Sequence, residues 1–343
     1  MTKVQFGLDT FGDIPRDLII NEQPDYPQAI RQVVKEAKLA EAVGVDIIAL
    51  GEHHRFDYAI SSPEVVLAAI ASVTNKITLG SAVTVLSSDD PVRVFERFAT
   101  VDALANGRAQ VMLGRGSFTE SFPLFGYDLA DYDQLFEEKV NLFSELLKEK
   151  ETTWTGQLRP ALSGANIFPK TQHGLSTWIG VGGSPESIIR AARYELPVML
   201  AVISGTPKRF APYIELAKQA AAKFQTQPQP IGIHSHGVIA TDQAQAETVA
   251  WYSIKAMMDQ LGRERGWSAM SKAQFDREIK TGSMYVGTPQ TVAKKIAKVI
   301  KTLNLARFDL VYGAGNQSIT EREATIRLYG EEVIPLVKEM LAE

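Results

Sequence analysis

The chain has 343 residues, of which 45% are hydrophobic and 22% are charged, and its formal net charge is −4. These are values of an ordinary globular protein with a sizeable core, and without a basic stripe they argue against a nucleic-acid partner. The chain has no cysteine, which excludes disulfides, thiolate metal sites and cysteine nucleophiles. Because the N-terminus lacks an apolar signal segment and no apolar run approaches the ~18 residues of a membrane helix, we expect a cytoplasmic protein that binds no membrane.

In chain order, predicted strands alternate with predicted helices. Apolar runs predict eight strands, at 3–10, 45–50, 76–85, 109–113, 177–181, 197–203, 230–240 and 307–312. Apolar residues at helical spacing, several of them after a Ser, Thr or Asp that precedes proline, predict helices at 27–43, from 63, from 91, 131–149, from 185, from 207, 242–261, 288–303 and 319–341.

This alternation predicts an α/β fold, a (β/α)8 or TIM barrel, as a single domain over residues 1–343. An open doubly wound sheet is the alternative, but residues 9–13, after the first strand, lack the Gly-x-Gly-x-x-Gly pattern. Two segments depart from the alternation and are interpreted as insertions. Residues 151–175 are irregular and rich in Pro and Gly, and residues 262–286 are rich in charge and Gly and are expected to be mobile.

The predicted strand at 109–113 runs directly into Gly114-Arg115-Gly116. In α/β barrels, ligand sites lie at this end of the strands. The guanidinium is a planar fork of donors that suits phosphate or carboxylate, and glycine lets a ligand approach the backbone. A loop arginine paired with a surface carboxylate is an equally good interpretation of this segment alone.

Histidines occur at two predicted strand positions. The second strand is followed by Glu52-His53-His54, where an imidazole is a candidate general base or hydrogen-bond donor, or else a core histidine. His234 and His236, two residues apart on the seventh strand, share one face, which either lines the pocket or faces the helices. Metal-dependent hydrolases use such a pair on the first strand with further ligands, and that order is absent here, so we expect no metal.

A phosphate site is predicted where the fifth strand ends. Gly182 and Gly183 form a glycine-rich turn, and Ser184 and Ser187 begin the next helix. Free N–H groups and the helix dipole at such a start suit an anion. With Arg115 from the neighbouring strand they would form a clamp with two sides for one phosphate. The start at residues 286–289 has a similar character.

Several short motifs occur together and in a fixed order. They are Glu52-His53-His54, Gly80-Ser81-Ala82-Val83, Asp90-Pro91-Val92-Arg93, Asn106-Gly107-Arg108, Gly114-Arg115-Gly116, Phe125-Gly126, Gly182-Gly183-Ser184 and Val286-Gly287-Thr288-Pro289. Their combination resembles the bacterial luciferase-like flavin-dependent monooxygenases, in particular the single-subunit, uncharacterised members, and the resemblance extends over about residues 3–340.

The resemblance implies a TIM barrel that binds reduced flavin, FMN, at the carboxyl ends of its strands. The phosphate contacts of the family fall on Arg115, on the Gly182-Gly183-Ser184 turn and on the hydroxyl of Ser187. A cis peptide between Ala82 and Val83 would lie beneath the flavin ring. His53 corresponds to the catalytic histidine and His54 to its neighbour, and residues 262–286 correspond to a mobile loop that would act as a lid.

The chain departs from the luciferases at two positions. Gly114 stands where they have a cysteine, and Ser121, next to Glu120, stands where they have an aspartate. Both departures argue against light emission and an aldehyde substrate.

We therefore expect a homodimeric, FMN-dependent monooxygenase that acts on paired donors, incorporates oxygen from O2 and converts a small organic substrate. A reductase or a transiently bound nicotinamide would supply the reduced flavin. The alternatives are a deazaflavin-dependent dehydrogenase, a non-catalytic flavin-binding partner subunit and a metal-dependent hydrolase.

Overall fold

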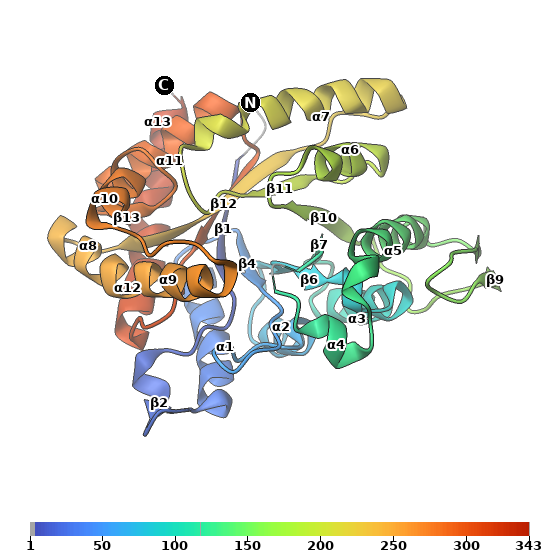
Figure 1. Cartoon of the computed structure of the whole chain (residues 1–343), viewed down its shortest axis with the longest axis horizontal. Helices are drawn as coiled ribbons and strands as arrows, with labels where there is room; N and C mark the ends of the chain where they lie inside the picture. Colours follow the sequence, from blue (N-terminus) through green and yellow to red (C-terminus); the bar gives the residue numbers. More distant parts are fainter. Residues whose placement is uncertain (1–3, 117, 343) are drawn as a thin grey trace.

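The computed structural model describes residues 4–116 and 118–342, and within them eight parallel strands close into a barrel (Figure 1). The strands follow chain order around the ring, and the last pairs with the first. They are β1 (Gln5–Thr10), β4 (Ile47–Leu50), β5 (Thr78–Ser81), β7 (Ala109–Gly114), β10 (Ser176–Val181), β11 (Val198–Ala201), β12 (Ile231–Ile239) and β14 (Arg307–Val311). The predicted (β/α)8 barrel is confirmed, and the open sheet is wrong.

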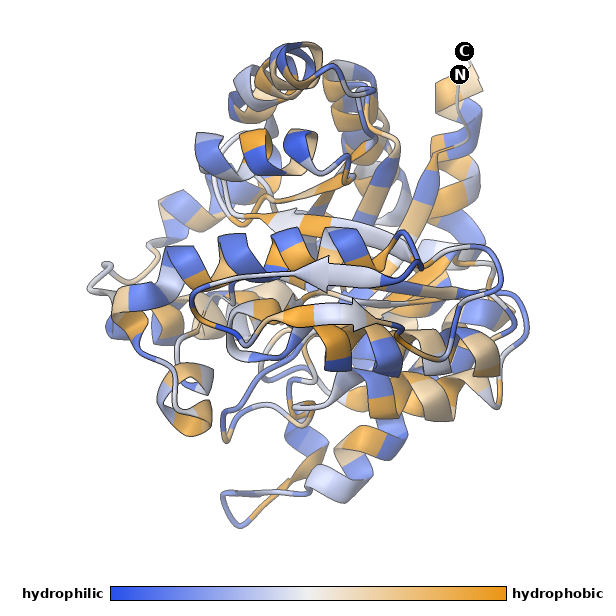
Figure 2. Cartoon of the chain, turned by 90° about the vertical axis from the view of Figure 1, so that its right-hand side faces the viewer, coloured by the Kyte–Doolittle hydropathy of each residue, from blue (hydrophilic) through white to orange (hydrophobic). Residues whose placement is uncertain are grey.

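Helices surround the barrel, and most of them bury one face against it. In Figure 2 the helices carry hydrophilic and hydrophobic stretches together, as a helix with one buried face requires. They are α1 (Tyr26–Ala42), α2 (Pro63–Ala71), α3 (Pro91–Leu104), α4 (Ser121–Phe125), α5 (Tyr132–Leu146), α6 (Pro185–Arg193), α7 (Ala211–Phe224), α8 (Gln243–Tyr252), α9 (Ile254–Arg265), α10 (Lys272–Lys280), α11 (Pro289–Leu303), α12 (Ile319–Leu328) and α13 (Ile334–Ala342). Among the described residues, no helix combines the length and apolar character needed to cross a membrane.

Several helices begin where the Ser/Thr/Asp–Pro pattern predicts. The Asp90 carboxylate accepts hydrogen bonds from the N–H groups of Val92 (2.9 Å) and Arg93 (3.2 Å) at the start of α3. The Ser184 hydroxyl accepts from the N–H of Ser187 at the start of α6. These bonds satisfy N–H groups that the first helical turn leaves without partners, so the side chains fix where the helices begin.

Two predicted long helices are interrupted. The helix expected at 242–261 is divided into α8 and α9 at Ser253, whose hydroxyl donates to the carbonyl oxygen of Val249 at 2.6 Å. The helix expected at 319–341 contains a π-helical turn, Tyr329–Val333, between α12 and α13. A side chain at Gly330 would overlap Val43, so the widened turn lies where the helix approaches the end of α1 most closely.

Short elements occupy the connections that the sequence left irregular. Residues 151–175 contain a hairpin of β8 (Thr152–Trp154) and β9 (Leu162–Ala165), and residues 13–27 contain one of β2 (Ile19–Ile20) and β3 (Gln23–Pro24). Both hairpins project from the barrel (Figure 1). The strand expected at 76–85 is divided into β5 and β6 (Thr84–Val85), with the expected cis peptide between Ala82 and Val83. A short strand, β13 (Tyr285–Gly287), pairs with the end of β12.

Candidate active site

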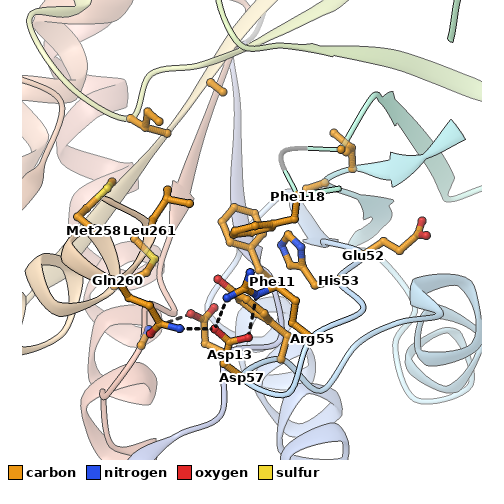
Figure 3. A pocket seen from close by; sticks show the side chains of 18 of the residues that line it. Phe11, Asp13, Glu52, His53, Arg55, Asp57, Phe118, Met258, Gln260 and Leu261 are labelled. Carbon is orange, nitrogen blue, oxygen red and sulfur yellow. Dashed lines mark hydrogen bonds and ion pairs between the residues drawn. The ribbon is translucent and has the colours of Figure 1, made fainter. Parts of the chain in front are cut away.

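A cavity of about 780 Å³ opens at the carboxyl ends of the barrel strands. This volume is within the range of small-molecule sites, roughly 300–1,000 Å³. Its walls include residues that follow the strands directly: Phe11 after β1, His53 after β4, Val83 after β5, Arg115 after β7 and Gly182 after β10. Helix α9 covers one side with Met258, Gln260 and Leu261 (Figure 3).

The Val83 side chain lies between two glycines on neighbouring strands. A Cβ at Gly114 on β7 would overlap the Val83 methyl groups, and a Cβ at Gly180 on β10 would lie 2.7 Å from Val83 Cγ1. Since real Cβ atoms essentially never come that close, both positions require glycine while Val83 keeps this place. Val83, with Met112 and Met199, forms an apolar surface against which a flat ring can lie.

Arg115 lies at the cavity and is also paired with a surface carboxylate. The side chain lines the cavity, and its Nη1 atom also pairs with the Asp133 carboxylate at 2.7 Å. The Asp133 side chain is 80% exposed. Exposed ion pairs contribute only about 0–1 kcal/mol, so a phosphate at the cavity rim can replace the carboxylate at little cost.

The glycine-rich turn after β10 reaches the cavity only in part. Gly182 belongs to the described cavity wall, whereas Gly183, Ser184 and Ser187 lie at the start of α6 outside that wall. The Ser184 and Ser187 hydroxyls lie 2.8 Å apart, and the Gly183 carbonyl oxygen accepts from the Tyr213 hydroxyl at 2.5 Å. The turn is therefore already held in place by the protein.

His53 lies in an aromatic environment. Its ring centroid is 4.3 Å from that of Tyr58, 5.1 Å from Phe118 and 5.5 Å from Phe11. Figure 3 shows His53 beside Phe11 and Phe118 in the cavity wall. Burial, with smaller contributions from the Arg55 charge and from His54, lowers the pKa of His53 to about 3. His53 is accordingly neutral at physiological pH and offers hydrogen bonds without carrying charge.

His54 does not accompany His53 into the cavity. Its Nε2 atom lies 2.9 Å from Glu52 Oε1, and its ring packs edge-on against Phe125. The other Glu52 oxygen accepts from the N–H of Val85 at 2.8 Å. Glu52, held by His54, thus fixes the backbone at Val85, two residues after the cis peptide bond.

His234 and His236 both line the cavity, so the pocket-lining interpretation of the His-x-His pair is confirmed. Asp9 Oδ2 lies 2.9 Å from Nδ1 of His234. Burial, with a smaller contribution from His234, lowers the pKa of His236 to about 3. Within the described part of the chain, no group of three or more His, Cys, Asp or Glu residues is placed to hold a metal ion.

Comparison with known proteins identifies the family. The family profile described as luciferase-like monooxygenase matches residues 18–304, which is most of the chain. The chain belongs to the luciferase-like monooxygenase family. Its membership confirms the expected oxidoreductase class.

Individual relatives are distant but match along the whole length. The alkanal monooxygenase alpha chain of Photorhabdus laumondii is 23% identical over 366 aligned residues, covering 94% of this chain and 97% of that protein. The oxygenating constituent of 3,6-diketocamphane monooxygenase from Pseudomonas putida, in complex with FMN, matches with a TM-score of 0.76 at 15% identity, covering 98% and 99%. The coenzyme F420-dependent tetrahydromethanopterin reductase of Methanopyrus kandleri matches with a TM-score of 0.70 at 19% identity, covering 97% and 99%.

Sequence reasoning missed Arg55 in this luciferase-like monooxygenase. Its guanidinium joins three carboxylates: Nε to Asp57 at 3.0 Å, Nη1 to Glu120 at 2.7 Å and Nη2 to Glu264 at 2.6 Å. Glu120 precedes α4 and Glu264 is on α9, so Arg55 ties the cover of the cavity to two loops. The Gln260 side chain adds a hydrogen bond to Asp57 at 3.0 Å (Figure 3). Arg55 and Asp57 are two residues apart, so their pairing could have been predicted locally. No pattern in the sequence predicts the pairing of Arg55 with the distant Glu120 and Glu264.

The predicted lid of this family member begins earlier in the chain than expected. The residues that cover the cavity lie on α9, at 254–265, rather than throughout 262–286. Helix α10 instead packs its buried Phe275 into a separate apolar cluster with Trp251 of α8. Much of the charge in the segment that was predicted to be mobile lies on the end of α9 and on α10, and α10 is anchored by its buried Phe275 and Ile279.

Proposed function

We propose that this protein is a flavin-dependent monooxygenase that binds reduced FMN and transfers oxygen from O2 to a small organic substrate, acting on paired donors. One observation carries the proposal. The cavity has an apolar floor at Val83, cleared on both sides by Gly114 and Gly180, and a cation at its rim, Arg115. This arrangement fits a flat ring with a phosphate tail.

The residues present fit the roles that FMN requires. Arg115 would hold the phosphate together with the N–H groups of Gly183 and Ser184 and the Ser187 hydroxyl, with Gly182 leaving room beside them. Ala82 and Val83 would lie beneath the ring. Bound reduced flavin supplies the O2 chemistry, which the protein itself cannot perform.

The neutral imidazole of His53 would orient the reacting oxygen or substrate by hydrogen bonding, and His54 would support it from behind. Helix α9 would exclude water, because Met258 and Leu261 present apolar surface to the cavity. Arg55 would hold this cover closed through its contact with Glu264.

A deazaflavin-dependent dehydrogenase is the second candidate. It is favoured by the match to the F420-dependent reductase, whose fold is the same. We also propose that the protein is a homodimer located in the cytoplasm. A separate reductase or a nicotinamide would supply its electrons. The closed, aromatic environment of His53 argues against a non-catalytic flavin-binding subunit, which would not require it.

Fluorescence titration with FMN, FAD, riboflavin and a deazaflavin, each oxidised and reduced, tests the proposal. Preferential binding of reduced FMN is the expected result, and it would justify a substrate screen with a reductase and O2. Preference for the deazaflavin would move the function to hydride transfer. Absence of binding by every one of these compounds would refute both candidates.

A further inference from the structure

The interior of the barrel, below the cavity, contains charged side chains. Asp9, Arg307 and Asp309 are completely buried, and they lie on the adjacent strands β1 and β14. Arg307 Nε donates to both Asp309 oxygens, at 2.8 and 2.9 Å, and its Nη1 donates to the Gln110 side chain. Gly7 makes room for this pair, because a side chain there would overlap the Asp309 carboxylate.

The charges in this interior do not balance. Two buried carboxylates, Asp9 and Asp309, face one guanidinium, Arg307, so one negative charge is left over. An uncompensated charge is strongly disfavoured in a medium of low dielectric constant, whereas one bound proton neutralises it. Burial, opposed by Arg307, raises the pKa of the Asp309 carboxyl, which agrees with a proton held in this group of side chains.

His234 connects this interior to the cavity. It lies beside Asp309 in the strand register between β12 and β14, and its Nδ1 atom is 2.9 Å from Asp9 Oδ2. Because a carboxylate only accepts, Nδ1 carries the proton of this bond. The side chain also lines the cavity, so Nε2 is the ring nitrogen that a ligand there can reach.

The other imidazoles in the cavity wall lack such support. Among the described residues, His234 is the cavity-lining histidine with a carboxylate bound to its ring. His53 is surrounded by aromatic rings, and the Nδ1 atom of His236 is buried without a hydrogen-bond partner. In the described part of the chain, neither of these two imidazoles has a carboxylate hydrogen-bonded to its ring.

We propose that His234, oriented by the buried Asp9, is the group that exchanges a proton with the ligand in the cavity. Nε2–H donates to an oxygen or nitrogen of the ligand, and the N–H electron pair stays on the imidazole, which becomes neutral. Asp9 retains the Nδ1–H bond and is the positioning residue. Nε2 then takes up a proton again from the cavity, because a protonated His234 balances the excess negative charge of Asp9 and Asp309 over Arg307. This inference deepens the proposed function and rests on it for the identity of the ligand.

Among the described residues, the charged and titratable groups near His234 include Asp9 on β1, Arg307 and Asp309 on β14, and His236 on its own strand. Tyr329, on the π-helical turn, is buried beside Asp9 and Asp309. The two carboxylates favour a proton on His234, while Arg307 and a protonated His236 oppose it. Since Arg307 is paired with Asp309, the carboxylate of Asp9 is the main group that favours a proton on His234.

Histidine-selective 15N labelling of the full chain tests this inference without any ligand. The chain has five histidines, so four signals can be assigned by their loss in the variants H53Q, H173Q, H234Q and H236Q, and the remaining signal belongs to His54. His173 is exposed and provides the reference. We expect the His234 signal to show a proton on Nδ1, because this atom lies 2.9 Å from the Asp9 carboxylate, which only accepts.

Asp9→Asn replaces the carboxylate with an amide that can either donate or accept, so the His234 signal should lose its preference for the Nδ1–H tautomer while the His173 signal stays unchanged. The Nε2–H tautomer of a neutral His234 ring in the unaltered protein would overturn the proposal, whether or not the Asp9 variant folds.

A second measurement separates this inference from the proposed function. FMN is titrated by fluorescence, and O2 then reoxidises bound reduced FMN at several pH values. A step in the dependence of the reoxidation rate on pH that is lost in His234→Gln would support the proton exchange, and a rate without such a step would refute it. Failure to bind FMN would refute the proposed cofactor, while the NMR spectrum still decides the tautomer of His234.

Discussion

The position of Val83 between two glycines allows a sharp test of the cavity floor. In Gly180→Ala the new Cβ would lie 2.7 Å from Val83 Cγ1, whereas the next atoms, Leu113 O and Met112 Sδ, are at 3.7 and 3.8 Å. The clash therefore involves a single methyl group. Overpacking of this kind costs about 1–3 kcal/mol, and we expect the free energy of unfolding to fall by that amount.

A double-mutant cycle isolates the contact. Val83→Ala removes the clashing methyl group, so Gly180→Ala in that background should be neutral or stabilise by about 0.4–1 kcal/mol, because alanine restricts the unfolded chain. The coupling free energy should be roughly 1–3 kcal/mol. Urea denaturation measures the stability of the four proteins, and FMN fluorescence titration reports whether the displaced Val83 also weakens the ring contact.

Gly182→Ala is the matched control. No described atom lies within 4 Å of a Cβ built at Gly182, and the residue also lines the cavity. Its effect on stability reports the change from glycine to alanine without a clash. If Gly180→Ala costs the same in the unaltered protein and in the Val83→Ala background, the side chain of Val83 does not fill the space between the strands as described.

Three further predictions concern the rim, the cover and the pH dependence of stability. Arg115→Ala should weaken FMN binding roughly ten- to a hundredfold and spare riboflavin, because a hydrogen bond to a charged group contributes about 1.5–3 kcal/mol; fluorescence titration measures both affinities. Arg55→Met should speed FMN release about fivefold, or about 1 kcal/mol, because it detaches α9 from two loops; stopped-flow displacement measures the rate. His236→Gln should flatten the pH dependence of unfolding. The unfolded chain binds more protons than the folded one between the ordinary pKa of 6.5 and about 3, so stability falls as pH falls through that window. Removing one such group should reduce the slope by up to about 1.4 kcal/mol per pH unit in urea denaturation.

Each of these predictions has a control and a contrary outcome. Equal weakening of FMN and riboflavin would remove Arg115 from the phosphate site. For Arg55, the control is Lys148→Met, which breaks an exposed pair with Glu145 on α5; equal release rates in the two variants would show that Arg55 does not hold the cover. An unchanged pH slope in His236→Gln would mean that the imidazole is protonated in the folded protein.

Local patterns in the sequence predicted the barrel well. The eight strands were found because strands buried on both faces are continuously apolar, and several helix starts were found because Asp90 and Ser184 cap them. The break at Ser253 was missed, because a serine is compatible with a helix and nothing in the local sequence reveals the irregular backbone, with φ −104° and ψ −73°, that Ser253 adopts there. The sequence also could not show that adjacent histidines diverge, with His53 in the cavity and His54 on Glu52.

The candidate site was predicted where a motif is contiguous and missed where its members are distant. Arg115 and Gly182 were found at strand ends, and both line the cavity. Arg55 meets Glu264 across 209 positions of the chain, and Asp9 meets His234 across 225. Periodicity and spacing describe only near neighbours, so such pairs follow from the closed barrel and not from any local pattern.

The arrangement of Arg307 and Asp309 also bears on how the barrel assembles. The two residues are two positions apart on β14, the last strand of the barrel in the sequence, and their side chains bind each other. The guanidinium and its carboxylate can therefore pair on the strand itself, before β14 docks between β12 and β1. When β14 then joins the barrel, the charges of Arg307 and Asp309 already neutralise each other. Their attraction offsets part of the free energy that is needed to remove these two charges from water.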